Sequence, residues 1–265
     1  MAAAARLYRA QDYAAAAAAL APVIAREPGN AEAQHLMGMC LRQRGDPQAR
    51  DAAKPWLEQA AALAPDNPEF VADLAGNCLE LADLHWSYGL AVRGRDLMEK
   101  ALQLDPNDVG GREGLMRFYR EAPWPLGDKA KAEAQAAEIL RRDPRRGALA
   151  AIYLRRTAKD YPGALALALA ALPRYPDDYR LLFEVGRGAS LAGAGRQVDD
   201  GIAALQRCQR EIPPMDAPGE STVAYLLGTL WEKKGDALAA RTAYADALRL
   251  DPANEPARRA LARRP

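Results

Sequence analysis

The chain has 265 residues, of which 49% are hydrophobic and 6% aromatic, and its formal net charge is +1. This apolar content excludes a chain that is disordered by composition, and its dominance by Ala and Leu suits close-packed helices better than a large β core. The balance of acidic and basic residues excludes the overall basic character expected of a nucleic-acid-binding chain.

The first segment, residues 1–30, opens with MAAAARLYRAQDYAAAAAAL and predicts two helices. Arg6, Arg9 and Asp12 interrupt its alanine runs, so it is a poor match for a secretory signal peptide. Neither this segment nor any other reaches the roughly 18 uninterrupted apolar residues of a membrane span. As it stands the sequence indicates the cytoplasm, but Met1 begins inside a helical pattern, and a leader removed upstream would indicate the periplasm.

The next segments, 31–67 and 68–108, follow one plan. In the first of them QRGDP (43–47) predicts a break between two helices, because Gly readily ends one helix and Asp caps the next. At the corresponding place the second carries DLHWSYGLAVRGRD (83–96), which predicts an inserted loop.

Segments 109–146 and 147–178 have their internal breaks at LGD (126–128) and AKDYP (158–162). In the first of these segments EAPWPLGDK (121–129) predicts a second inserted loop, rich in Pro and Gly. Inserted loops in repeat proteins tend to fall on one face, where partners often bind.

Segments 179–218 and 219–254 complete the series, and 255–265 predicts a solvated cap helix. A third insertion is predicted at AGAGRQVDD (192–200), and a short break is predicted at KKGDA (233–237).

A proline-containing stop phrase, such as LQLDP or LRLDP, ends each segment. Pro lacks an amide donor and disfavours helical geometry in the residue before it, so each phrase predicts a helix end. Asn or Asp often follows within two residues and can cap the next helix. The prolines, spaced 32 to 41 residues apart, are Pro28, Pro65, Pro106, Pro144, Pro176, Pro213 and Pro252, and the candidate caps are Asn30, Asn67, Asp108, Asp178 and Asn254. Each segment is therefore predicted to be a helical hairpin, which must stack on its neighbours to bury its apolar stripe.

Small residues are predicted to let the paired helices approach closely. Gly228 stands in the middle of the first helix of the last segment, and Gly186 takes the equivalent place in segment 179–218. The surrounding LLFEVGRGASLAGAG has Leu191 where a dinucleotide-binding loop needs its third Gly, so no such cofactor is predicted.

VAYLLGTLWEKKGDALAARTAYADALRLDPAN (223–254) resembles a nearly complete tetratricopeptide repeat, with its Leu-Gly pair, Gly-Asp break and Asp-Pro end. AQHLMGMCLRQRGDP (33–47) and KDYPGALALALAALPRYPDD (159–178) resemble its first and second halves. The resemblance implies an all-α fold, a right-handed superhelical α-solenoid of about seven such hairpins and a C-terminal cap helix. It implies a single domain over 1–265, with repeats at about 1–30, 31–67, 68–108, 109–146, 147–178, 179–218 and 219–254, and the cap helix at 255–265.

In this family the first helices of successive repeats line a concave groove that usually takes a peptide. By resemblance, the groove residues are His35, Met39, Arg42, Asp73, Glu113, Arg117, Arg120, Arg146, Tyr153, Arg156, Phe183, Glu184, Arg187, Tyr225 and Thr229. Four of these arginines, at 117, 120, 156 and 187, predict a groove that favours a partner segment with acidic and apolar residues. The alternative is that they are solvated arginines of an Arg-rich chain. The positions that form the lysine and asparagine clamp for chaperone C-termini in this family carry unsuitable residues here.

Trp86 and Trp124 are candidate loop contacts with a partner. The alternative interpretation, in which each ring folds back to cover its own lengthened hairpin, is favoured at this stage.

The sequence holds no complete catalytic or metal-binding motif. Cys40, Cys78 and Cys208 are scattered and predict reduced, buried thiols. Cys78 and His85 could share a helix face, but they do not supply the converging ligands of a zinc site. No Gly-x-Ser-x-Gly elbow occurs. The sequence therefore predicts no enzyme activity, no cofactor and no metal.

The predicted function is a non-catalytic scaffold, of bacterial type, that binds a protein or peptide segment in its groove. One alternative is assembly with further copies of the same chain. The other is an accessory role in which the basic C-terminal tail, PARRALARRP (256–265), contacts nucleic acid or an envelope surface.

Overall fold

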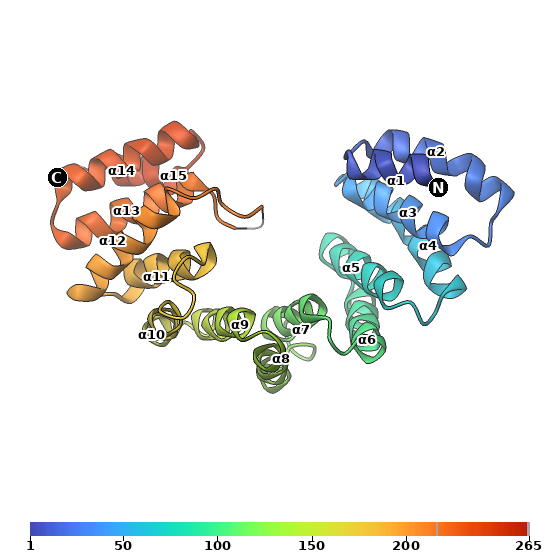
Figure 1. The fold of residues 1–265 in the computed structure, drawn as a ribbon, viewed down its shortest axis with the longest axis horizontal. Coiled ribbons are helices and arrows are strands. Elements are labelled where there is room, and N and C mark those ends of the chain that lie inside the picture. Colours follow the sequence, from blue (N-terminus) through green and yellow to red (C-terminus); the bar gives the residue numbers. More distant parts are fainter. Residues whose placement is uncertain (216, 264–265) are drawn as a thin grey trace. The chain divides into compact units, whose positions relative to one another are not determined.

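The computed structural model describes residues 1–215 and 217–263, and within them the fold is entirely helical (Figure 1). The all-α prediction is confirmed. The helices are α1 (Ala2–Arg9), α2 (Tyr13–Arg26), α3 (Ala31–Gln43), α4 (Pro47–Leu63), α5 (Pro68–His85), α6 (Tyr88–Leu104), α7 (Val109–Glu121), α8 (Lys129–Arg142), α9 (Pro144–Thr157), α10 (Tyr161–Ala171), α11 (Tyr179–Ala192), α12 (Arg196–Cys208), α13 (Glu220–Lys234), α14 (Ala237–Leu250) and α15 (Glu255–Ala262).

Consecutive helices pair into hairpins, namely α1–α2, α3–α4, α5–α6, α9–α10, α11–α12 and α13–α14, and α15 follows the last pair. The chain divides into an N-terminal unit (Met1–Gln135) and a C-terminal unit (Ala136–Pro265), and the division falls within α8. Inside each unit a helix packs mainly on the helices before and after it in sequence. The first helices of successive hairpins also contact each other: α3 contacts α5, and α9 contacts α11. The predicted stacking of hairpins is confirmed within each unit. A single solenoid over all 265 residues stays a prediction.

The N-terminal unit buries its apolar residues between successive helices. Leu20 of α2 packs with Met37 and Cys40 of α3, and Leu57 of α4 packs with Leu74 of α5. None of the described helices has both the length and the apolar character needed to cross a bilayer.

The C-terminal unit has two buried clusters. The larger one runs from α9 to α13 and includes Leu182, Leu205 and Leu227. The smaller one joins α13, α14 and α15 around Tyr244 and Ala257, so α15 covers the end of the last hairpin.

The stop phrases act as predicted at most helix starts. The Asn30, Asn67, Asp178 and Asn254 side chains accept hydrogen bonds from backbone N–H groups in the first turn of the following helix. Asp108 precedes α7, but its side chain makes no capping bond, so that predicted cap is wrong.

The internal breaks also form, and one of them has a residue other than Gly in the left-handed position. Gly45 and Gly235 have positive φ angles of 78° and 85° before the capping residues Asp46 and Asp236. Between α9 and α10 Lys159 takes the same left-handed conformation, with φ 63°.

Two of the three predicted insertions are wrong. Residues 83–96 are almost all helical, because α5 continues to His85 and α6 begins at Tyr88. Residues 192–200 likewise contain only a short turn between α11 and α12. The loop between α7 and α8, within 121–129, is confirmed. A long connection that was not predicted instead joins α12 to α13, and its Ile212 and Met215 side chains are exposed.

Candidate functional site

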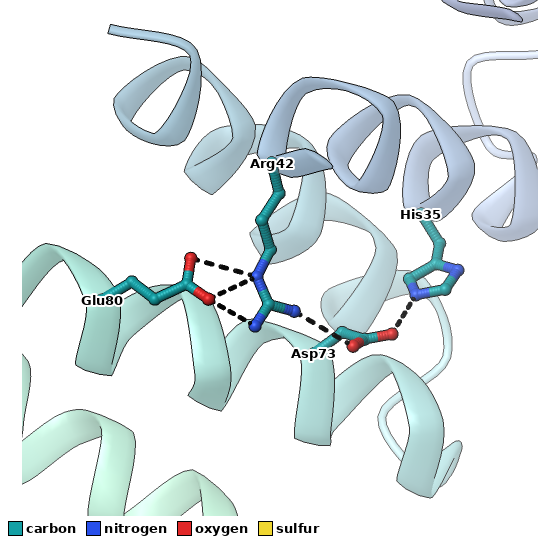
Figure 2. Close-up of polar contacts among 4 residues, drawn as sticks. All are labelled: His35, Arg42, Asp73 and Glu80. Carbon is teal, nitrogen blue, oxygen red and sulfur yellow. Dashed lines mark hydrogen bonds and ion pairs between the residues drawn. The ribbon is translucent and has the colours of Figure 1, made fainter. Parts of the chain in front are cut away.

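A polar network joins α3 to α5 in the N-terminal unit (Figure 2). The His35 Nε2 atom lies 2.7 Å from Asp73 Oδ2, and Arg42 Nη1 donates to Asp73 Oδ1 over 3.3 Å. Arg42 also donates to Glu80 Oε1, over 3.1 Å from Nε and 2.7 Å from Nη2. Three predicted groove residues, His35, Arg42 and Asp73, are thus brought together, and Glu80 joins them.

The network satisfies the charge of Arg42. Burial acts to lower the pKa of Arg42, but its hydrogen bonds to Glu80 and the negative charges of Glu80 and Asp73 outweigh this effect and raise that pKa. Because two carboxylates already hold the guanidinium, this part of the predicted groove links two successive hairpins rather than presenting a free cation.

Met39, the remaining candidate on α3, is partly buried. It packs against the cluster formed by Leu57, Leu74 and Cys78. Its side chain therefore contributes to the joint between hairpins.

The candidates on α7 and the first part of α9 are also engaged. Arg117 is exposed and the others are half-buried. Every one of them takes part in an interaction within the chain, so none is without a partner; the set is Glu113, Arg117, Arg120, Arg146 and Tyr153. Their contact with another protein stays a prediction.

A small pocket in the C-terminal unit brings together Arg156 of α9 with Glu184 and Arg187 of α11, and we call it the Arg156–Arg187 pocket. It is completed by four further lining residues, Tyr161, Ala164, Gly188 and Leu191. Arg187 donates from Nε to Glu184 Oε2 over 3.2 Å, and a second, shorter bond joins the same two side chains. The Arg156 guanidinium lies over the ring of Tyr153, 5.4 Å from its centroid.

The charges in this pocket do not balance. Burial lowers the pKa of Arg187; the negative charge of Glu184 opposes this effect, and the positive charge of Arg156 adds to it. Arg156 makes no ion pair or hydrogen bond to any described residue through its guanidinium, and its Nε atom is buried without an acceptor. The pocket therefore holds two guanidinium groups but only one carboxylate, and that carboxylate pairs with Arg187.

The remaining three groove candidates make contacts within the chain. Phe183 is 3% exposed and lies in the core with Arg187 over its ring, so its assignment as an open groove residue is wrong. Tyr225 packs against Tyr244, with ring centroids 5.8 Å apart. Thr229 donates its hydroxyl to the Leu226 carbonyl over 2.7 Å.

Trp86 and Trp124 lie in turns and are 94% and 90% exposed. The interpretation favoured from the sequence, in which each ring covers its own hairpin, is therefore wrong. Their exposure suits contact with a partner, and that contact stays a prediction.

The arginine tail is partly neutralised by its own helix. Arg258 and Arg259 both pair with Glu255 in α15. Arg264 and Pro265 lie outside the described residues. Contact of this tail with nucleic acid or an envelope surface remains a prediction, as does self-assembly.

Sequence reasoning missed Glu80 and Tyr161. A signal for Glu80 exists, because Arg42 and Glu80 are 38 residues apart, as are His35 and Asp73. Such an equal offset places both pairs on the same face of successive hairpins. No comparable signal marks Tyr161, whose position depends on how α10 packs.

Known proteins match the N-terminal part of the chain in sequence and most of the chain in fold. The family model of the tetratricopeptide repeat matches residues 1–68, which hold the first two hairpins. No curated protein matches the chain.

Solved structures match over nearly the whole chain. A tetratricopeptide repeat protein from Parabacteroides merdae has a TM-score of 0.67 at 15% identity, covering 97% of this chain and 94% of its own. The type IV pilus biogenesis factor PilW has a TM-score of 0.63 at 18% identity, covering 87% of this chain and 98% of its own. The C-terminal part of a repeat protein from Cytophaga hutchinsonii has a TM-score of 0.58 at 14% identity, covering 98% of both chains.

At these identities the likeness concerns the fold. Residues 1–68 carry the sequence signature of the family, and the hairpins that follow share its architecture. The first two hairpins therefore match the tetratricopeptide repeat family in sequence, and the rest of the chain resembles solved members of that family in its fold.

Proposed function

We propose that the chain is a non-catalytic scaffold that holds a segment of another protein, and that the Arg156–Arg187 pocket recognises a carboxylate of that segment. The fold supports the first part, because stacked hairpins provide an extended surface built from successive first helices. Arg156 and Arg187 lie on two such helices, α9 and α11, which contact each other.

The observation that carries the proposal is the missing acceptor of Arg156. A half-buried guanidinium without a carboxylate is costly, because burial removes water without supplying a replacement hydrogen bond. A partner carboxylate would supply it through the planar, forked donors that favour this geometry. Glu184 does not fill this role, because its two oxygens pair with Arg187 instead.

The same pocket also offers apolar contact. Leu191 is 50% exposed at its edge, and Ala164 and Gly188 line it. The preferred segment therefore combines an Asp or Glu with a neighbouring apolar residue. Since the net charge of the whole chain is +1, recognition rests on this local arrangement rather than on general attraction for polyanions.

Selection from a random peptide library tests the proposal. The native chain is expected to enrich peptides with an acidic residue next to an apolar one, and Arg156→Gln is expected to lose that enrichment. Arg174→Gln is the matched control, because Arg174 also lies over a tyrosine ring, that of Tyr175, but outside the pocket.

Binding of a selected peptide is then measured by fluorescence anisotropy at several salt concentrations. Arg156→Gln is expected to weaken binding by about 2 kcal/mol, the usual contribution of a charged hydrogen-bonded pair. If the selected peptides bind Arg156→Gln as tightly as the native chain, the pocket is not part of the recognition surface. If the library yields no acidic peptide, the proposal that the partner segment carries an Asp or Glu is wrong.

A further inference from the structure

A second cluster of chemically distinctive side chains lies at the α3–α5 joint, outside the Arg156–Arg187 pocket. One ligand atom each from His35, Glu69 and Asp73 lies within 4.8 Å of the others. Glu69 and Asp73 are four residues apart on α5 and therefore share a face, and α3 brings His35 to that face. Within the described part of the chain, this is the one group of three or more such residues that converges in this way.

We infer that His35, Glu69 and Asp73 form a binding site for a divalent transition-metal ion, a role distinct from peptide recognition. The donor set is one imidazole nitrogen and two carboxylates. Zinc, cobalt and nickel accept such mixed nitrogen and oxygen ligands, whereas calcium and magnesium favour oxygen alone. Three protein ligands with further positions left to solvent is the arrangement of an open zinc site.

The surrounding residues hold two of the ligands in place. The His35 ring stacks on Phe70, with centroids 4.4 Å apart and planes inclined by 25°. Arg42 holds Asp73 Oδ1, which leaves Asp73 Oδ2 directed at the imidazole (Figure 2). Such outer contacts orient metal ligands and reduce the ordering that binding requires.

The third ligand is anchored at its backbone and free at its tip. Asn67 accepts a hydrogen bond from the Glu69 N–H over 3.0 Å, which fixes the first turn of α5. The Glu69 side chain is exposed, so its carboxylate can turn toward the other two ligands.

The local charge also favours a cation. Glu69, Asp73 and Glu80 supply three negative charges against the single positive charge of Arg42, so the group carries a net charge of about −2 when His35 is neutral. A divalent ion between His35 and the carboxylates would neutralise that excess.

The chain contains a natural control for this inference. His85 Nε2 lies 2.8 Å from Asp51 Oδ1, which is the same kind of histidine–carboxylate pair. No third ligand converges on it among the residues that the structure describes. The thiols of Cys40, Cys78 and Cys208 are buried, so they do not compete for added metal in the native state.

The test is a calorimetric titration of the full chain, without a histidine tag, with Zn²⁺. Native protein and His85→Ala are both expected to bind one ion per chain with the same affinity. Glu69→Gln is expected to bind at least about tenfold more weakly, since loss of a direct ligand costs no less than loss of an outer-shell contact. This substitution keeps the size of the side chain and leaves the His35–Asp73 contact intact.

Two further readouts separate metal binding from a change in folding. Zn²⁺ is expected to raise the thermal midpoint of the native chain and of His85→Ala, but not of Glu69→Gln. Co²⁺ is expected to give visible absorption bands that depend on His35. The inference is overturned if millimolar Zn²⁺ does not bind, if Glu69→Gln binds as well as the native chain, or if binding depends on His85.

Discussion

Gly228 of α13 lies directly against the ring of Tyr244 of α14. A Cβ atom added at Gly228 would lie 2.8 Å from Tyr244 Cζ and closer still to two other ring atoms. The same relationship joins Gly38 to Leu57 and Gly94 to Leu79, each between the two helices of a hairpin. A glycine in the first or second helix thus sets how closely each of these pairs packs.

Replacing Gly228 by Ala is expected to destabilise the chain by about 1–3 kcal/mol, because the fully packed tyrosine ring has no space into which to move. Urea unfolding followed by circular dichroism measures the change. Gly89→Ala in α6 is the control, because nothing lies within 4 Å of its added Cβ. It is expected to stabilise the helix by up to about 1 kcal/mol. Equal effects at both positions would contradict the proposed role of Gly228.

The Arg42 network is expected to stabilise the joint between the second and third hairpins. Arg42→Met leaves Asp73 and Glu80 without their shared cation and is expected to cost about 1–2 kcal/mol in the free energy of unfolding. Arg249→Met breaks an exposed pair with Asp246 and is expected to cost about 0.5 kcal/mol or less. If both substitutions cost the same, the network adds nothing beyond an ordinary surface pair.

Stability is expected to fall at alkaline pH. Burial raises the pKa of the Cys40 thiol to about 11 and that of Cys208 to about 12. Above pH 9.0, the ordinary thiol value, the unfolded chain loses these protons while the native state keeps them, so the free energy of unfolding decreases as pH rises. The contribution is absent at neutral pH, where both states are protonated.

For each buried thiol the loss is about 1.4 kcal/mol per pH unit between the unfolded pKa and the native pKa. Urea unfolding at several pH values between neutral and alkaline solution measures it. Cys208→Ala is expected to make the decrease shallower. A slope that this substitution does not change would show that other groups control the alkaline transition.

Trp86 is expected to reduce stability in its native position. It has a φ angle of 51°, a left-handed conformation that is unfavourable for a bulky residue, and its ring is almost wholly exposed. Trp86→Gly should therefore raise the free energy of unfolding by about 1 kcal/mol, because it relieves this conformation and loses little packing. Lys159→Gly is the matched control at φ 63° and should behave similarly.

A stabilising effect of Trp86→Gly together with weaker binding of a partner would indicate that the aromatic ring is retained for contact. Trp124→Ala should leave stability nearly unchanged, since its ring is also exposed. Loss of stability in Trp86→Gly would contradict the conformational argument.

The stop phrases made the helix order predictable from sequence, because Pro and the capping Asn or Asp act locally. The loop predicted at residues 83–96 failed for a physical reason. The predicted loop includes Gly89 and Gly94, but both lie inside α6, where Gly94 permits contact with Leu79. Trp86, a residue type that seldom adopts positive φ, forms the turn. Local sequence propensity predicts neither the close packing at Gly94 nor the turn at Trp86.

The candidate sites were predictable only in part. The family register placed Arg156 and Arg187 on successive first helices, and the structure brings both to one pocket. It did not reveal that Arg42 would be held by Asp73 and Glu80 while Arg156 lacks an acceptor. That difference depends on side-chain partners from neighbouring hairpins, which a pattern within one repeat cannot specify.

The eight residues of α15 have a consequence for how the chain behaves toward its own copies. Ala257 is completely buried against the cluster that contains Ala224, Tyr244 and Ala247. Proteolysis before Glu255 would leave this apolar surface open at the end of the stack. Two shortened copies could cover it by meeting face to face, and longer polymers could follow from offset contacts. The packing of α15 on the last hairpin thus covers an apolar surface through which copies of the chain would otherwise associate.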